Sequence, residues 1–111
     1  MAKLNKTQKT AFHDFKEMMG ALGDYAFFFS RENGVSAMAF FTGPKKKHVR
    51  IVVVHCGEND TFKKKIGFVE CACRMEKDAG IVLPAVFNTL DDCLEDFLLS
   101  IFDCGYKWET I

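Results

Sequence analysis

Residues 25–42 read YAFFFSRENGVSAMAFFT, and this stretch decides the fold. Two Phe-rich segments, 25–32 and 35–42, flank the dipeptide Asn33-Gly34. That dipeptide is typical of a type I′ β-turn, because both central positions of the turn need positive φ. The stretch therefore predicts a β-hairpin with a two-residue loop.

The turn also predicts the register of the hairpin. If Glu32 faces Val35, Phe29 pairs with Met38, Phe28 with Ala39 and Phe27 with Phe40. Side chains alternate along a strand, so one face collects large apolar residues: Phe27, Phe29, Met38 and Phe40. The other face carries Phe28 and Phe41 among alanines.

Three further strands are expected after the hairpin. Residues 48–55 (HVRIVVVH) are apolar on both faces in their second half, which is typical of a central strand. Residues 66–74 form the expected fourth strand and residues 81–83 a short fifth one. Pro84 suits the edge or the end of a strand, because it lacks an N–H.

Helical spacing appears on both sides of these strands. Asn5 and Gln8 have the form of a capping box, and an apolar stripe follows at spacings of three and four: Ala11, Phe12, Phe15, Met18, Met19 and Leu22. A second helix begins after Asn88 or Thr89 and ends before Gly105. Its expected buried stripe is Leu90, Cys93, Leu94, Phe97, Leu98 and Ile101.

The resulting prediction is one α+β domain over residues 1–111, with an N-terminal helix, an antiparallel meander of four to five strands and a C-terminal helix. Two layers, with both helices on one sheet face, bury the two stripes most simply. The second face is then too apolar for water alone, so we expect a homodimer. The expected dimer interface consists of Phe28, Phe41, Val52, Val54 and Phe68.

Composition and cysteine usage limit the protein class. The 111 residues are 49% hydrophobic and 27% charged, as in ordinary globular domains. The longest apolar runs are far shorter than a membrane span, and no secretory leader is visible. Five cysteines, an odd number, favour free thiols in a reducing compartment. We therefore expect a cytoplasmic protein.

Catalytic and metal-binding signatures are weak in this sequence. It contains no P-loop, G-x-S-x-G, H-E-x-x-H or dinucleotide-binding fingerprint, so we do not expect an enzyme or a cofactor. Cys71 and Cys73 would share one face of a strand, but with His55 or Cys56 they match no standard zinc spacing, and no metal is expected. His55 and Cys56 would point to opposite faces, which disfavours a catalytic pair.

The charges are balanced in sum but segregated along the chain. Residues 1–65 contain twelve basic and six acidic side chains, and residues 66–111 contain three and nine. This asymmetry indicates an electrostatic partner, unless the two halves neutralise each other on folding. The outer face of the C-terminal helix would bind a basic protein surface, with Leu99 as its desolvated centre. The expected partner-binding residues are Asp91, Asp92, Glu95, Asp96, Leu99 and Asp103.

Two lysine-rich segments give the alternative. They contain Lys45, Lys46, Lys47 and Arg50, and then Lys63, Lys64 and Lys65. Lysines bind phosphates without reading sequence, so such binding would be non-specific and salt-sensitive. In a meander these two segments lie at opposite ends of the sheet unless the second loop folds back.

The sequence thus predicts a small non-catalytic interaction module that binds, and inhibits, a macromolecular partner. Its size, thiol pattern and charge segregation suit an accessory protein of a phage or mobile element that acts against host defence. The alternative is a non-specific nucleic-acid-binding protein.

Overall fold

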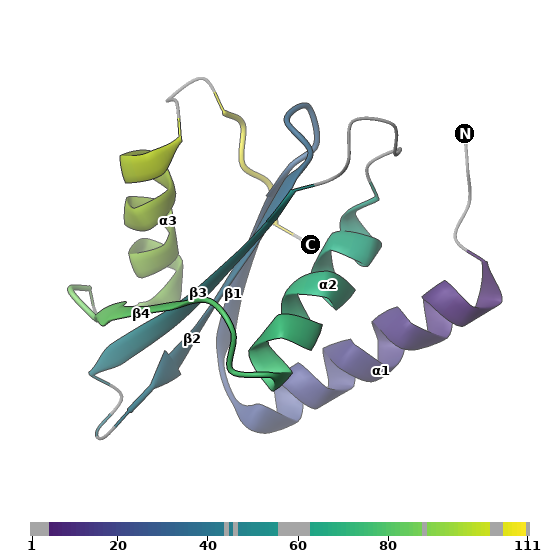
Figure 1. Ribbon diagram of the computed structural model, residues 1–111, viewed down its shortest axis with the longest axis horizontal. Coiled ribbons are helices and arrows are strands. Elements are labelled where there is room, and N and C mark those ends of the chain that lie inside the picture. Colours follow the sequence, from purple (N-terminus) through teal and green to yellow (C-terminus); the bar gives the residue numbers. More distant parts are fainter. Residues whose placement is uncertain are drawn as a thin grey trace.

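The computed structural model describes residues 5–43, 45, 47–55, 63–87, 89–102 and 106–110, except the side chain of Leu22. Figure 1 shows the arrangement of the elements. They are α1 (Lys6–Leu22), β1 (Tyr25–Ser30), β2 (Val35–Thr42), β3 (His48–His55), α2 (Lys64–Glu76), β4 (Ile81–Pro84) and α3 (Leu90–Ile101). The strands form one sheet in the order β1-β2-β3-β4, with antiparallel neighbours throughout. The predicted α+β class and antiparallel meander are confirmed.

The β1–β2 hairpin forms where predicted, but its register differs by two residues. Ser30 pairs with Val35, so the loop contains four residues, 31–34, and Phe27 pairs with Met38. Asn33 does not adopt the positive φ that a type I′ turn needs, and its side chain donates a 2.9 Å hydrogen bond to Ser30 Oγ. Gly34 adopts the positive φ of 65° that the turn requires. A shift of two residues keeps every side chain on its predicted face.

Helix α2 replaces the predicted fourth strand at 66–74. Ile66, Phe68 and Val69 have high strand propensity, but the buried residues Phe68, Cys71 and Ala72 are spaced as on one helical face. The fully buried Phe68 ring packs against the sheet at Phe27, with ring centroids 5.1 Å apart. Burial of that stripe outweighs local strand propensity.

The helices cover both faces of the sheet, so the prediction that they share one face is wrong. α3 packs on β1 and β2 over a core that contains Ala37, Ile51 and Leu94. On the other face α2 packs on β2 and β3 over Met38 and Val52, and α1 packs on α2. Figure 1 shows α3 on one side of the sheet and α1 with α2 on the opposite side. The unforeseen helix α2 supplies the cover that the second face needs.

The five residues of the predicted dimer interface do not form one surface. Phe28 and Phe41 pack into the α3 side of the core, whereas Val52, Val54 and Phe68 belong to the α2 side. Val52 and Phe68 are also buried within the chain. The face on which the dimer was predicted is therefore covered by helices of the same chain.

The two edges of the sheet differ in how they are covered. Along β1, the Phe29 N–H donates to the Glu109 carbonyl at 2.9 Å, and the Glu109 N–H donates to the Phe29 carbonyl at 2.8 Å. The C-terminal segment thus pairs with the β1 edge. At the opposite edge, β4 pairs with β3 only, among the described strands.

A buried hydroxyl beneath α2 leads to a stability prediction. Ser36 is 1% exposed, and its Oγ finds no hydrogen-bond partner in the described part of the chain. An unpaired buried polar group is unfavourable, so Ser36→Ala is expected to raise the free energy of unfolding by about 1 kcal/mol. Ser30 is equally buried, but its Oγ accepts from Asn33, so Ser30→Ala is expected to lower it by about 1 kcal/mol. Urea unfolding of both variants measures the two changes in the free energy of unfolding. A decrease in S36A would show that the Ser36 hydroxyl has a hydrogen-bond partner.

Candidate interaction surface

Helix α3 is built to present one apolar and one acidic face. The Thr89 hydroxyl caps it by accepting a 3.2 Å hydrogen bond from the Asp92 N–H. Asp91 and Asp92 lie in the first turn, where carboxylates interact favourably with the helix dipole. Leu90, Cys93, Leu94 and Leu98 form the buried stripe on the sheet. This predicted amphipathic helix is therefore present, with four of the six predicted stripe residues buried.

The outer face of α3 carries the predicted partner-binding residues. Asp91, Asp92, Glu95 and Asp96 are all exposed, and Leu99 lies among them with 55% of its surface accessible. The helix contains no basic residue. Asp103 lies outside the described residues. We call the four carboxylates and Leu99 the acidic face.

No basic side chain among the described residues forms an ion pair with the acidic face. Among the described residues, the ion pair that forms is His13 with Glu17, at 3.2 Å within α1. The expectation that the two halves of the chain neutralise each other by direct pairing therefore finds no support in this part of the chain. The four carboxylates are exposed and have no ion-pair partner in the described part of the chain.

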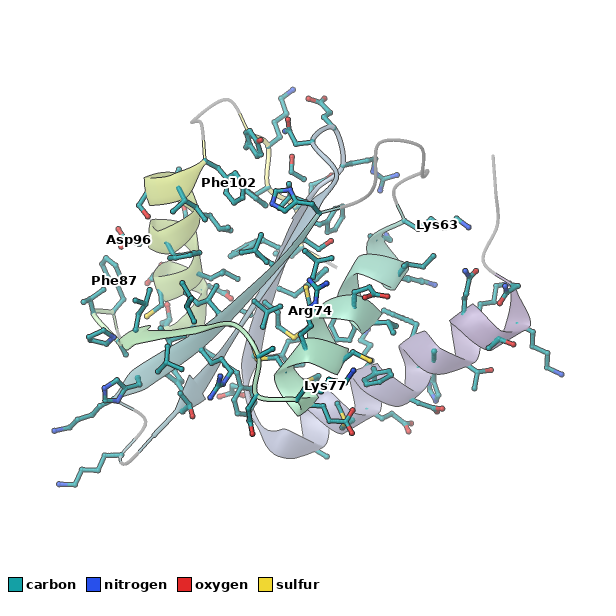
Figure 2. All side chains as sticks on the ribbon, viewed as in Figure 1. Lys63, Arg74, Lys77, Phe87, Asp96 and Phe102 are labelled. Carbon is teal, nitrogen blue, oxygen red and sulfur yellow. The ribbon has the colours of Figure 1, made fainter. Side chains whose placement is uncertain are left out.

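Three apolar side chains near α3 extend the exposed surface beyond the prediction. Ile101 was expected in the buried stripe but is 52% exposed. The next residue, Phe102, packs inward instead. The centre of its ring lies 6.0 Å from that of His55 and 5.6 Å from that of Trp108. Val86 and Phe87, just before the helix, are 70% and 43% exposed. Figure 2 shows Phe87 and Asp96 on the same side of α3, away from the sheet.

The opposite face of the molecule is basic. Helices α1 and α2, with Lys63 and Lys77 at the ends of α2, carry eight Lys or Arg side chains against four carboxylates. Because these helices lie across the sheet from α3, this excess of basic side chains is on the side opposite the acidic face. The segregation seen along the sequence is thus retained in space.

The two lysine-rich segments are not brought together. Lys45 and Lys47 are exposed in the β2–β3 turn, and Lys63 precedes α2 at the other end of the sheet. Lys64 is exposed, and Lys65 Nζ lies 5.1 Å from the centre of the Phe12 ring. Lys46 lies outside the described residues.

The Arg50 side chain forms hydrogen bonds with backbone carbonyl groups of the same chain. Its Nη1 donates to the Asp78 carbonyl at 2.6 Å and to the Ala79 carbonyl at 3.4 Å. These contacts tie the turn after α2 to β3. Arg50 therefore has a structural role at this position through its Nη1 atom.

The three described cysteines, Cys71, Cys73 and Cys93, are free thiols. Cys71 and Cys73 lie on a helix, where residues two apart point to different sides, and not on a strand as predicted. Burial raises the pKa of the Cys71 thiol to about 12, so it stays protonated and inert. No group of three His, Cys, Asp or Glu suited to a metal occurs among the described side chains. Cys56 lies outside that part of the chain.

Comparisons with protein-family models, curated proteins and solved structures find no match for this chain. Within the described residues, no helix has the length and apolar character needed to cross a membrane. The functional proposal therefore depends on the surfaces themselves.

Proposed function

We propose that the protein is a non-catalytic interaction module that binds a basic surface of a protein partner through the acidic face of α3. The single observation that carries this proposal is Leu99, 55% exposed among four carboxylates that no described basic group pairs. An apolar side chain that loses water on binding contributes affinity, and the surrounding charges contribute partner selection and association rate. The acidic face combines an exposed apolar side chain with surrounding charges on one surface.

The mode of action follows from this chemistry. A partner held by its basic surface cannot present that surface to another anionic ligand such as nucleic acid. We propose inhibition by occupancy, which suits an accessory protein of a phage or mobile element acting against a host defence factor. Exposed Phe87, on the same side of α3 as Asp96, enlarges the apolar contact beside the acidic face.

Non-specific nucleic-acid binding is the weaker proposal. The separation of Lys45 and Lys47 from Lys63 argues against one phosphate-tracking stripe. The acidic face would also repel a nucleic acid that wrapped around the molecule. A labelled oligonucleotide tests this alternative, because its binding at low salt would have to be lost when Lys45, Lys46 and Lys47 are changed to Glu.

Leu99→Arg is expected to remove partner binding without unfolding the protein. The substitution places a cation at the centre of the acidic face, where it repels a basic partner surface and removes the apolar contact, so affinity should fall at least tenfold. The measurement is capture of the partner by the tagged chain, followed by titration with the partner recovered. Far-ultraviolet circular dichroism checks that the fold is intact.

A matched control separates this effect from a general change in surface hydrophobicity. Val82 on β4 is 45% exposed, comparable to Leu99, but it lies outside α3. Val82→Lys should therefore retain the partner at wild-type affinity. Full partner binding by L99R, or equal losses in both variants, would contradict the proposed role of the acidic face.

A further inference from the structure

The outer edge of β4 has hydrogen-bonding groups that no described strand uses. The Ala85 N–H donates to the Lys47 carbonyl at 2.8 Å, so alternate residues 81, 83 and 85 direct their backbone groups toward β3. Val82 and Pro84 therefore direct theirs away from the sheet. Val82 offers both an N–H and a C=O, and Pro84 offers a C=O alone.

The side chains of this edge are apolar on both faces of the sheet. Ile81 and Leu83 pair with Ile51 and Val49, which lie on the α3 side, and Val82 lies on the α2 side. Ile81, Val82 and Leu83 are 45%, 45% and 36% exposed. Residues 79–87 contain no charged side chain. Native edges are usually protected by charge or by a covering segment, and here the β1 edge has such a segment.

We propose that a second copy of this chain adds its β4 to this edge, antiparallel, with a two-fold axis at Val82. In that register the Val82 N–H of each copy donates to the Val82 carbonyl of the other. Ile81 then lies opposite Leu83 of the partner subunit, so apolar side chains meet on both sheet faces. Pro84, without an N–H, limits the paired segment to the few residues around Val82.

The charge pattern favours a second copy over an unrelated strand. Residues 79–87 carry no charge with which a charged partner strand could pair. The same uncharged segment of a second copy is complementary to them. In the two-fold register, the Pro84 end of β4 in one copy lies next to the Ile81 end of β4 in the other. Exposed Lys47 lies beside the first end, and exposed Asp78 of the partner subunit precedes the second. The exposed side chains of residues 81–83, with Val86, offer on the order of 300 Å² per copy.

That area is below the range of stable specific interfaces and is typical of weak, transient ones. Two copies would bury about 600 Å² in total, so we expect a weak dimer with a dissociation constant on the order of 100 µM. The dimer would leave the acidic face of α3 uninvolved. It would also replace the predicted interface, whose residues lie inside the fold.

Sedimentation velocity of the full chain from about 1 to 500 µM tests the proposal. The mass is expected to rise from 12.6 kDa toward twice that value. Val82→Lys and Val82→Glu should each remain monomeric, because like charges would meet at the two-fold axis. An equimolar mixture of V82K and V82E should recover the dimer, since opposite charges then meet there, and a misfolded variant would not give this result.

Leu99→Arg is the matched control, because it changes an equally exposed apolar residue that lies on α3. This variant should dimerise like the wild type. A wild-type mass of 12.6 kDa throughout the range, or dimers of V82K alone, would overturn the proposal. So would a mixture that stays monomeric, or loss of the dimer in L99R.

Discussion

Phe68→Ala is expected to lower the free energy of unfolding by about 4 kcal/mol. Phe68 is 0% exposed and sits where α2, α1 and β1 meet. Its ring makes edge-on contacts with Phe12 at 5.5 Å, Tyr25 at 5.6 Å and Phe27 at 5.1 Å. The substitution removes these contacts and leaves a cavity that the rigid sheet cannot close. Domains of this size have roughly 5–15 kcal/mol of total stability, so the variant would be close to unfolding.

Urea unfolding at 25 °C measures this effect, and Phe87→Ala is the control. Phe87 is 43% exposed, so its truncation is expected to cost under about 1 kcal/mol. Equal losses in the two variants would contradict the position of α2 on the sheet. A strand at 66–74, as local propensity suggested, would not bury Phe68 beneath α1.

Gly80→Ala is expected to destabilise the protein by about 3 kcal/mol. Gly80 has a φ of 96°, which L-residues with side chains rarely adopt. A Cβ there would also clash with the Ile51 carbonyl oxygen and would lie 2.9 Å from Val52 Cγ2. The first neighbour is backbone of β3 and cannot rotate away. The change would therefore displace the turn that leads from α2 into β4.

Gly20→Ala is the matched control, with an effect of opposite sign. Gly20 lies within α1, and a Cβ there meets no atom within 4 Å. Alanine favours the helix and restricts the unfolded chain, so this variant should gain about 0.5–1 kcal/mol. Thermal unfolding of the two variants checks both signs. A Gly80→Ala variant as stable as the wild type would contradict the close approach of this turn to β3.

The elements that sequence predicts well are those whose signals are local. The capping box of Asn5 and Gln8 is present, with both reciprocal hydrogen bonds, at 2.8 and 3.0 Å. The Asn33-Gly34 signal gives the hairpin and the face of every side chain in it, although the loop is two residues longer. The stripe of α3 and its acidic face follow directly from a 3.6-residue period.

Helix α2 illustrates where a local signal misleads. Ile66 and Val69 favour a strand, but Phe68, Cys71, Ala72 and Met75 recur at intervals of three and four. Weighing that spacing over the whole segment would have predicted the helix. With a strand at 66–74 in place of this helix, both outer helices are expected on one sheet face, and the other face is expected to be apolar and uncovered.

The surfaces depend on tertiary structure to different degrees. Leu99 and its neighbouring carboxylates are identifiable from one helix alone. The free edge of β4 is not, because it depends on the order of four strands and on the segment that ends at Glu109 covering the other edge. Val86 and Phe87 become exposed because the connection to α3 runs outside the core.

Carboxylate footprinting of the protein bound to its captured partner tests the role of the acidic face most directly. Carbodiimide coupling to glycine ethyl ester labels accessible carboxylates, which mass spectrometry then locates. We expect Asp91, Asp92, Glu95 and Asp96 to lose labelling in the complex, while Asp14 and Glu76 across the sheet keep it. Unchanged labelling of the four α3 carboxylates, with protection confined to α1 or α2, would contradict the proposed binding surface.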